Sequence, residues 1–275
     1  MSRDHRRTPA TNAANPTRDE KPAGFEIRQS RRETLDKLMG TVDPGHIRPR
    51  PSARIPSGII EALRSVDGGL TELVADALDE LGIDGAIPGS VLVPILVGTR
   101  VVGPALTFKQ VPSRADPHLS ARARSSSSGL HEVHYQAQAG DVLVIEGLVG
   151  VSSLGGIMAR LGRSRGEVGA VVDGSVRNVA LMRRDAFPVW ARGVTPITGK
   201  WRLDAVEING SVVIAGVPVN AGDLVVADDS GVCFVPGAYI ARVYDWVAMK
   251  AGFERTVFAN LGDESTKART DVDAS

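Results

Sequence analysis

The ten residues GAVVDGSVRN, 169–178, decide the fold of this chain, because they join a buried strand to polar residues at its carboxyl end. The apolar run that they contain is typical of a strand covered on both faces. We interpret Asp173-Gly174-Ser175 as a turn and residues 176–184 as a helix, with Arg177 in its first turn. The stretch therefore predicts a strand, a turn and a helix in immediate succession.

The same alternation continues on both sides of this stretch. DVLVIE (141–146) and FPVWARG (187–193) are two further strand patterns, and IMARLGRSR (157–165) is a helix pattern that ends near Gly166. Connections this short between strands and helices indicate βαβ units with parallel strands and right-handed crossovers. The carboxyl ends of these strands are therefore expected to meet at one edge of a sheet.

The flanking segments predict the rest of the domain. Amphipathic helix patterns come first, broken strands follow, and the last third reads as short strands joined by Asn-Gly, Ala-Gly and Asp-Asp-Ser-Gly turns. These segments are IIEALRSV (59–66) and LTELVADALDELG (70–82) for helices, SVLVPILVG (90–98) and TRVVGPALTFKQV (99–111) for broken strands, and 206–236 for hairpins.

Composition divides the chain into three parts. Residues 1–55 are polar and lack sustained apolar periodicity, so we predict a flexible or subunit-clasping N-terminal extension with a weak helix at 31–40. Residues 56–262 form the α/β domain, and residues 263–275 form a polar C-terminal tail.

The charge balance and the cysteine content exclude several classes of protein. The 32 basic and 32 acidic residues give a formal net charge of zero, which argues against a nucleic-acid partner or an anionic membrane surface. No apolar run approaches the length of a membrane span, and the N-terminus lacks a signal-peptide core. The single cysteine, Cys233, lies in an apolar run and is expected in the core. We expect a soluble cytoplasmic protein.

The predicted sheet edge is the candidate ligand site. In an open α/β sheet, ligands bind beyond the carboxyl ends of the strands. The loop at Leu154-Gly155-Gly156 and the turn at 173–175 would both lie there, each leading into a helix N-terminus that favours an anion. Arg177 adds a planar donor fork that suits a carboxylate. In the alternative interpretation, Gly174 only tightens the turn and Arg177 pairs with a surface acid.

A pair of histidines is a second, weaker candidate. His131 and His134 are three residues apart with Glu132 between them, so on a helix they would share a face and could hold a metal. Because metal sites need a third ligand, we favour a solvated pair on a surface helix.

Seven segments resemble the RraA-like family in order and spacing, and the resemblance covers about residues 65–240. That family includes class II 4-hydroxy-4-methyl-2-oxoglutarate aldolases, related oxaloacetate decarboxylases and regulators of RNA degradation. The resemblance implies a swivelling β/β/α sandwich that assembles as a trimer or hexamer. The segments are ADALDELG (75–82), VGPALTF (102–108), GDVLVIEG (140–147), LGGIMA (154–159), GAVVDGSVRN (169–178), FPVWARGVTP (187–196) and VNAGDLVVADDSGVCFVP (219–236).

The resemblance also implies a site. In the aldolases, Mg²⁺ or Mn²⁺ holds a pyruvate-like unit, a Gly-acid-Leu/Ile loop binds the substrate, and an Arg-Asp pair follows. The matching positions are Gly155, Gly156 and Ile157 for the substrate-binding loop, and Arg177 and Asn178 for the pair. Gly156 and Asn178 thus replace the two acids, which should weaken a hard-cation site severely and leaves Asn178 as the remaining metal-ligand candidate. Arg177 and Asp173 are the predicted catalytic residues.

Three functions stay open from the sequence. The first is a lyase that performs retro-aldol cleavage or decarboxylation of a small 2-oxo acid with an altered metal site. The second is a metal-independent isomerase, cyclase or eliminating enzyme that acts on a carboxylated intermediate. The third is a non-catalytic RraA-like binding or regulatory oligomer. For the second, the acid or base candidates are Lys109, His118, His131, Lys200 and Glu207.

Overall fold

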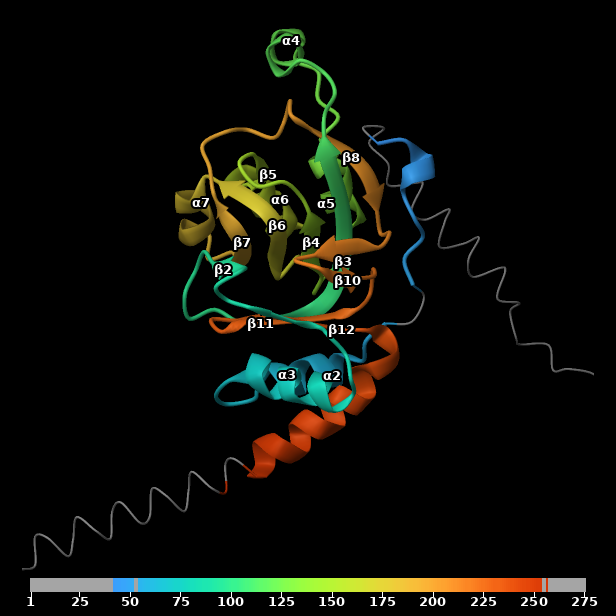
Figure 1. Cartoon of the computed structure of the whole chain (residues 1–275), viewed down its shortest axis with the longest axis vertical. Coiled ribbons are helices and arrows are strands. Elements are labelled where there is room, and N and C mark those ends of the chain that lie inside the picture. The colour runs from blue at the N-terminus through green and yellow to red at the C-terminus, as the bar shows by residue number, and fades with distance from the viewer. Residues whose placement is uncertain (1–41, 52–53, 254–255, 257–275) are drawn as a thin grey trace, which may run out of the picture.

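The protein is described by a computed structural model that covers residues 42–51, 54–253 and 256 (Figure 1). Its helices are α2 (Ser57–Arg64), α3 (Leu70–Glu80), α4 (Pro117–Ala123), α5 (Leu130–Gln136), α6 (Gly156–Ser164) and α7 (Val179–Arg184), with short 3-10 helices η1 (Pro44–His46) and η2 (Gly237–Tyr239). Its strands are β1 (Ala86–Pro88), β2 (Val93–Pro94), β3 (Val101–Pro112), β4 (Val142–Glu146), β5 (Ser152–Gly155), β6 (Gly169–Arg177), β7 (Val189–Val194), β8 (Leu203–Ile208), β9 (Val212–Ile214), β10 (Val217–Val219), β11 (Leu224–Asp228) and β12 (Gly231–Val235).

The long strand β3 belongs to two sheets. Its first residues pair antiparallel with β11, and from Ala105 onward it pairs parallel with β4. One sheet therefore has the order β1-β12-β11-β3, and the other has the order β3-β4-β6-β7-β2. This arrangement confirms the predicted sandwich of two sheets with helices.

The central strands are parallel, as the βαβ pattern predicts. Val142 pairs with Ala105 on one side and with Gly169 on the other, and Val189 pairs with Ala170. The last third forms the antiparallel hairpins β9–β10 and β11–β12, which confirms the prediction from its turn residues. The carboxyl ends of β4, β6 and β7 thus lie at one edge.

Apolar residues fill three layers around these sheets. Helices α2 and α3 and the helix that starts at residue 240 cover the outer face of the β11–β12 sheet (Figure 1), where Leu70, Val74 and Leu78 are buried. A second cluster lies between the sheets, and a third packs α5 and α6 against the parallel strands. Cys233 is 2% exposed within the first cluster, and burial raises the pKa of its thiol to about 12, so the expectation of a core cysteine is confirmed.

The predicted turn at residues 173–175 is wrong. Strand β6 continues through these residues to Arg177, because the loop after β4 supplies hydrogen bonds to them: the Gly147 amide donates to the Asp173 carbonyl, and the Ser175 amide donates to the Leu148 carbonyl. The pairing of β6 with β7 is irregular here, as in a β-bulge. Arg177 is therefore the last residue of a strand and does not lie in the first turn of a helix.

The residues before α2 that the structure describes contact the domain. The guanidinium of Arg50 donates to both carboxylate oxygens of Asp141, whose side chain is 1% exposed. Ile47 is buried and forms an isolated parallel β-bridge with Ile208. The predicted weak helix at 31–40 lies outside the described residues. None of the described helices combines the length and the apolar character that a membrane span requires.

Candidate active site

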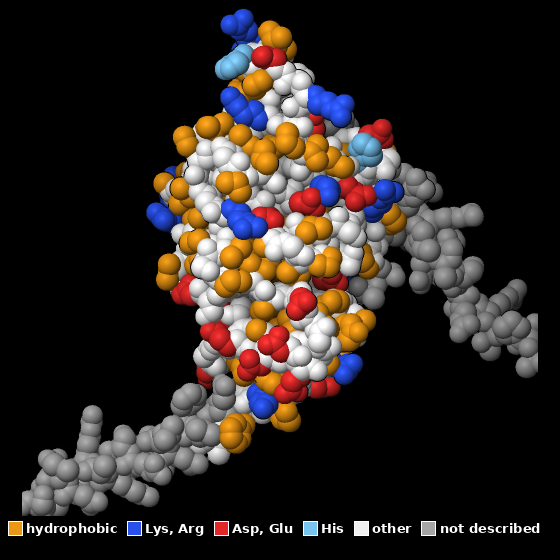
Figure 2. Space-filling model, viewed as in Figure 1, with side chains coloured by type: hydrophobic (Ala, Val, Ile, Leu, Met, Phe, Trp, Pro, Cys, Tyr) orange, Lys and Arg blue, Asp and Glu red, His pale blue; other side chains and the backbone are white. Residues whose placement is uncertain are grey.

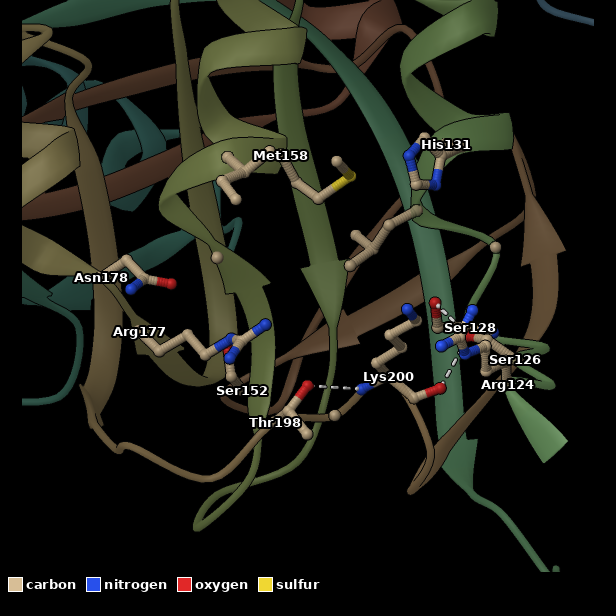
Figure 3. A pocket seen from close by; sticks show the side chains of 15 residues that line it. Arg124, Ser126, Ser128, His131, Ser152, Met158, Arg177, Asn178, Thr198 and Lys200 are labelled. Atoms are coloured by element: carbon tan, nitrogen blue, oxygen red, sulfur yellow. Dashed lines mark hydrogen bonds between the residues drawn. The ribbon is translucent and has the colours of Figure 1, made fainter. Parts of the chain in front are cut away.

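A pocket of about 470 Å³ opens at the carboxyl edge of the parallel strands (Figure 3). This volume suits a small molecule. Residues from the β3–α5 connection, the β5–α6 junction, the end of β6 and the β7–β8 loop surround it. They are Arg124, Ser126, Ser128, Gly129, Leu130, His131, Ser152, Gly155, Ile157, Met158, Arg177, Asn178, Thr198, Gly199 and Lys200.

Arg177 reaches this pocket because β5 pairs with the end of β6. Gly155 is the register partner of Arg177, and a Cβ atom placed on Gly155 would lie 3.4 Å from Arg177 Nε. A Cβ atom at that distance would be in ordinary van der Waals contact, so the Arg177 side chain lies directly beside the Gly155 backbone. Within the described chain, the Arg177 guanidinium has neither a hydrogen bond nor an ion pair. The predicted proximity of Arg177 and the 155–157 loop is confirmed.

The three residues of that loop have different environments. Gly155 is extended and is the N-cap of α6, and the side chain of Ile157 is 67% exposed at the pocket. Gly156 is buried behind them. A Cβ atom there would lie 2.7 Å from the Cβ of Leu181 and 2.8 Å from the carbonyl oxygen of Asn178. Close packing of α6 on α7 therefore excludes a side chain at position 156.

Asp173 lies outside the pocket lining. Its carboxylate accepts hydrogen bonds from Arg192 Nε at 2.6 Å and from the backbone amide of Ala215 at 2.6 Å. The second contact ties β6 to the β9–β10 turn. The structure thus separates the two residues that we predict to be catalytic, and a catalytic role for Asp173 stays a prediction.

Most of the candidate acids and bases also lie elsewhere. The ammonium of Lys109 pairs with Glu146 at 2.7 Å, and Glu207 pairs with Arg48 at 2.6 Å. His118 lies on the projecting helix α4 and is not part of the lining. Lys200 and His131 do line the pocket.

The two histidine side chains of α5 lie in different environments. His131 lines the pocket, whereas His134 is fully buried, with Nδ1 2.7 Å from Glu167 Oε1. The expectation of a solvated pair is therefore wrong for His134, because α5 packs one side against α6. No group of three or more metal-ligating His, Cys, Asp or Glu side chains occurs in the part of the chain that the structure describes.

Arg124 is the charged lining residue that sequence reasoning missed, and several uncharged lining residues, such as Ser126, Ser128 and Thr198, were missed as well. It follows α4 in a left-handed conformation, with φ of 54°, within a segment that projects from the body of the molecule (Figure 1). Basic and histidine side chains gather at the top of the view over this projection (Figure 2). No spacing rule links Arg124 to Arg177, because a loop excursion of irregular shape brings them together.

The pocket is cationic. Arg124, Arg177 and Lys200 line it, and its described lining contains neither Asp nor Glu. Asp116, which precedes Arg124 at the start of α4, is the N-cap of that helix. Its carboxylate accepts hydrogen bonds from the Leu119 and His118 amides, and these hydrogen bonds lower the pKa of the carboxyl. The charge of the pocket therefore favours an anionic ligand.

The described residues do not fit the divalent metal that the family resemblance implies. Mg²⁺ and Mn²⁺ prefer carboxylate and other oxygen ligands. The lining offers the Asn178 amide and several hydroxyl groups without a carboxylate, and it places three cationic side chains around the same space. Position 156 cannot supply an acid, because the contacts with α7 fill that space.

Comparison with known proteins agrees with the fold. The solved structure of Streptomyces coelicolor RraAS2, described as an unusual member of the RNase ES inhibitor RraA protein family, matches with a TM-score of 0.62 and 29% identity, over 75% of this chain and 98% of that one. An uncharacterized Pseudomonas syringae protein matches with a TM-score of 0.64 and 27% identity, over 77% and 95% of the two chains.

Sequence relatives agree as well. Protein DlpA of Legionella pneumophila is 28% identical over 72% of this chain, but the matched region is only 31% of DlpA. A Halalkalibacterium halodurans protein named "Putative 4-hydroxy-4-methyl-2-oxoglutarate aldolase" is 30% identical over 60% of this chain and 72% of its own length. The model of the RraA-like family, described as Aldolase/RraA, matches residues 71–234. This match covers more than half of the chain, which therefore belongs to the RraA-like family.

Proposed function

We propose that this protein is a lyase that performs decarboxylation or retro-aldol cleavage of a small 2-oxo acid in the cationic pocket, with a metal site altered from that of the family's aldolases. One observation carries the proposal. Arg177 is presented at the end of β6 beside Gly155, without an anionic partner in the described chain, in a pocket of small-molecule size. The family, with its aldolase-named relative, supports the reaction class.

The chemistry requires stabilisation of an enolate. In decarboxylation, the bond from C3 to the departing carboxylate breaks, CO₂ leaves, and the electron pair moves into the C2 carbonyl. In retro-aldol cleavage, the C3–C4 bond breaks while the C4 hydroxyl loses its proton and becomes a carbonyl. Both give the enolate of the 2-oxo acid fragment, which takes up a proton at C3.

Arg177 and the backbone amides at the start of α6 suit the negative charges of the substrate and of the enolate. The guanidinium can hold the C1 carboxylate through two parallel hydrogen bonds, and free amides at the start of α6 lie beside it. Lys200 adds a second positive charge to the same pocket, which favours an anionic substrate. His131 is the lining side chain whose chemistry suits proton transfer.

The test is pyruvate release by the full-length protein. Oxaloacetate and a 4-hydroxy-2-oxo acid are supplied in separate assays with Mn²⁺, with Mg²⁺ or with EDTA, and pyruvate is measured by a coupled reduction. The same chain with Arg177→Gln corrects for spontaneous and free-metal decarboxylation of oxaloacetate. We expect release above this control. Persistence in EDTA would identify metal-independent catalysis, whereas strict dependence on Mn²⁺ would place metal ligands outside the described lining.

A non-catalytic RraA-like binding role is the second candidate. It is favoured by one observation, the lack of a carboxylate among the described lining residues that could serve as a general base. RraAS2, with 29% identity, belongs to a family of RNase ES inhibitors. If no 2-oxo acid is cleaved above the Arg177→Gln control in any of the three conditions, the lyase proposal fails and this role takes its place.

A further inference from the structure

We propose that Arg124 and Lys200 form a second anion subsite, so that the pocket binds an elongated ligand with two anionic groups. Arg177 would hold one group, and Arg124 with Lys200 would hold the other. This inference deepens the proposed function by assigning ligand specificity to two residues that lie outside the seven segments that carry the family resemblance.

The two residues come from separate loops that form one wall. The Ser126 hydroxyl donates to the Lys200 carbonyl at 2.7 Å, and the Ala205 amide donates to the Ser127 carbonyl at 2.8 Å. These contacts join the segment after α4 to the β7–β8 loop and to strand β8. Figure 3 shows Arg124, Ser126 and Ser128 on the side of the pocket away from Arg177 and Asn178, with Lys200 between them.

The backbone of this wall is fixed while its charges stay available. The Lys200 amide donates to the Thr198 hydroxyl at 3.2 Å, and its ammonium lies 5.3 Å from the centroid of the Trp201 ring. Neither the Lys200 ammonium nor the Arg124 guanidinium has an ion pair within the described ranges. A wall whose backbone is held by hydrogen bonds and that carries unpaired cations is preorganised for an anion.

The acids close to this wall have other partners. Asp116 caps α4 through the His118 and Leu119 amides, at 2.8 and 2.9 Å. Asp204 accepts a short hydrogen bond from the Ser127 hydroxyl. Two cations that share a pocket without a carboxylate repel each other, and a bound anion relieves this repulsion.

The second anionic group of the ligand is a carboxylate or a phosphate, because the two groups are recognised by the same donors. Both accept paired hydrogen bonds from a guanidinium and a charged hydrogen bond from an ammonium. The hydroxyl group of Ser128 lies on the same wall and can contribute a further donor, whereas the Ser126 hydroxyl already donates to the Lys200 carbonyl.

Binding of inert ligands to the full-length protein tests the subsite. Propionate carries one anionic group, succinate carries two carboxylates, and phosphoglycolate carries a carboxylate and a phosphate. By calorimetry, we expect succinate or phosphoglycolate to bind at least tenfold more tightly than propionate. The tighter of the two identifies the chemistry of the second group.

Variants assign the preference to the two residues. Arg124→Gln and Lys200→Gln should each remove most of the preference while propionate binding changes less than twofold, and Arg177→Gln should weaken all three ligands. Arg122→Gln on α4 is the matched control for a general loss of positive charge, because Arg122 does not line the pocket. Thermal unfolding of each variant verifies that it is folded.

Equal affinity for the three ligands, or a preference that survives both the Arg124 and the Lys200 substitution, would overturn the subsite. Because the ligands do not react, this result does not depend on turnover. A protein with the dianion preference but without pyruvate release keeps the subsite and loses the lyase proposal.

Discussion

Strand β6 carries two charged residues, of which one is paired within the protein and the other is not. Asp173 has its carboxylate shared between Arg192 and the Ala215 amide, whereas Arg177, four residues later, faces the pocket without a described partner. Asp173 belongs to a paired row, which we define as Arg48, Glu207, Lys109, Glu146, Asp173 and Arg192. The pocket cations Arg124, Arg177 and Lys200 form the unpaired group.

The paired row has a structural role. Glu146 and Asp173 are register partners on β4 and β6. Their carboxylates accept hydrogen bonds from the β9–β10 hairpin, Glu146 from the Val213 amide and Asp173 from the Ala215 amide. The charges of the paired row are therefore neutralised by partners within the protein. The cations of the pocket are free to bind a ligand. At this sheet edge, the presence or absence of a partner distinguishes a charged residue with a structural role from one with a functional role.

The largest effect is expected where the family's acid is restored. Gly156→Asp forces a side chain against Leu181 and the Asn178 carbonyl, which lie 2.7 and 2.8 Å from the new Cβ atom. Overpacking and burial of a carboxylate should lower the free energy of unfolding by about 3 kcal/mol or more. Urea denaturation measures this loss, and a variant as stable as the parent would contradict the tight packing of α6 on α7.

Gly155→Asp is the matched control for that substitution. Position 155 is the extended N-cap of α6, where Asp is favoured, so stability should change by less than about 1 kcal/mol. Its carboxylate would lie beside Arg177 and convert a free cation into a paired one. We expect weaker binding of succinate without unfolding.

The next largest effect is expected where the unpaired charge is removed. Arg177→Gln should lower turnover and ligand affinity about 100-fold, or about 2.7 kcal/mol, because a charge-assisted bidentate contact is lost. The melting temperature should barely change, since the guanidinium has no described partner. Calorimetry and thermal unfolding check the two parts. Arg192→Gln in the paired row should show the reverse pattern, and equal losses of binding in both variants would erase the distinction.

Removal of the paired acid is expected to act on stability. Asp173→Ala loses two charged hydrogen bonds, to Arg192 and to the Ala215 amide, which should lower the free energy of unfolding by about 2 kcal/mol. Turnover of the folded variant should stay within threefold of the parent. A variant with parental stability but without turnover would instead support the predicted catalytic role of Asp173.

The smallest effect belongs to the outer end of the paired row. Glu207 pairs with Arg48, whose side chain is 58% exposed, so water screens the pair. Glu207→Gln should change the free energy of unfolding by less than about 0.5 kcal/mol. A loss as large as that of Asp173→Ala, measured in the same urea titration, would show that the row acts as one cooperative unit.

The sequence alone determined the architecture. Apolar runs of β6 and its neighbours, with short helical patterns between them, predict parallel strands, and the periodicity of 70–82 predicts the buried face of α3. Such patterns depend on residues a few positions apart, so they are readable locally. The proximity of Arg177 to Gly155 also followed, because parallel strands place their carboxyl ends at one edge.

Only the tertiary structure decided how far β6 extends and which charges are paired. The hydrogen bonds from the Gly147 and Ser175 amides extend the strand through a sequence that resembles a turn, and Arg192 engages Asp173. Arg124 enters the pocket through a projecting loop that no periodicity describes. Pairing depends on which strands and loops meet in space, and residues far apart in the chain carry no local signal of that meeting.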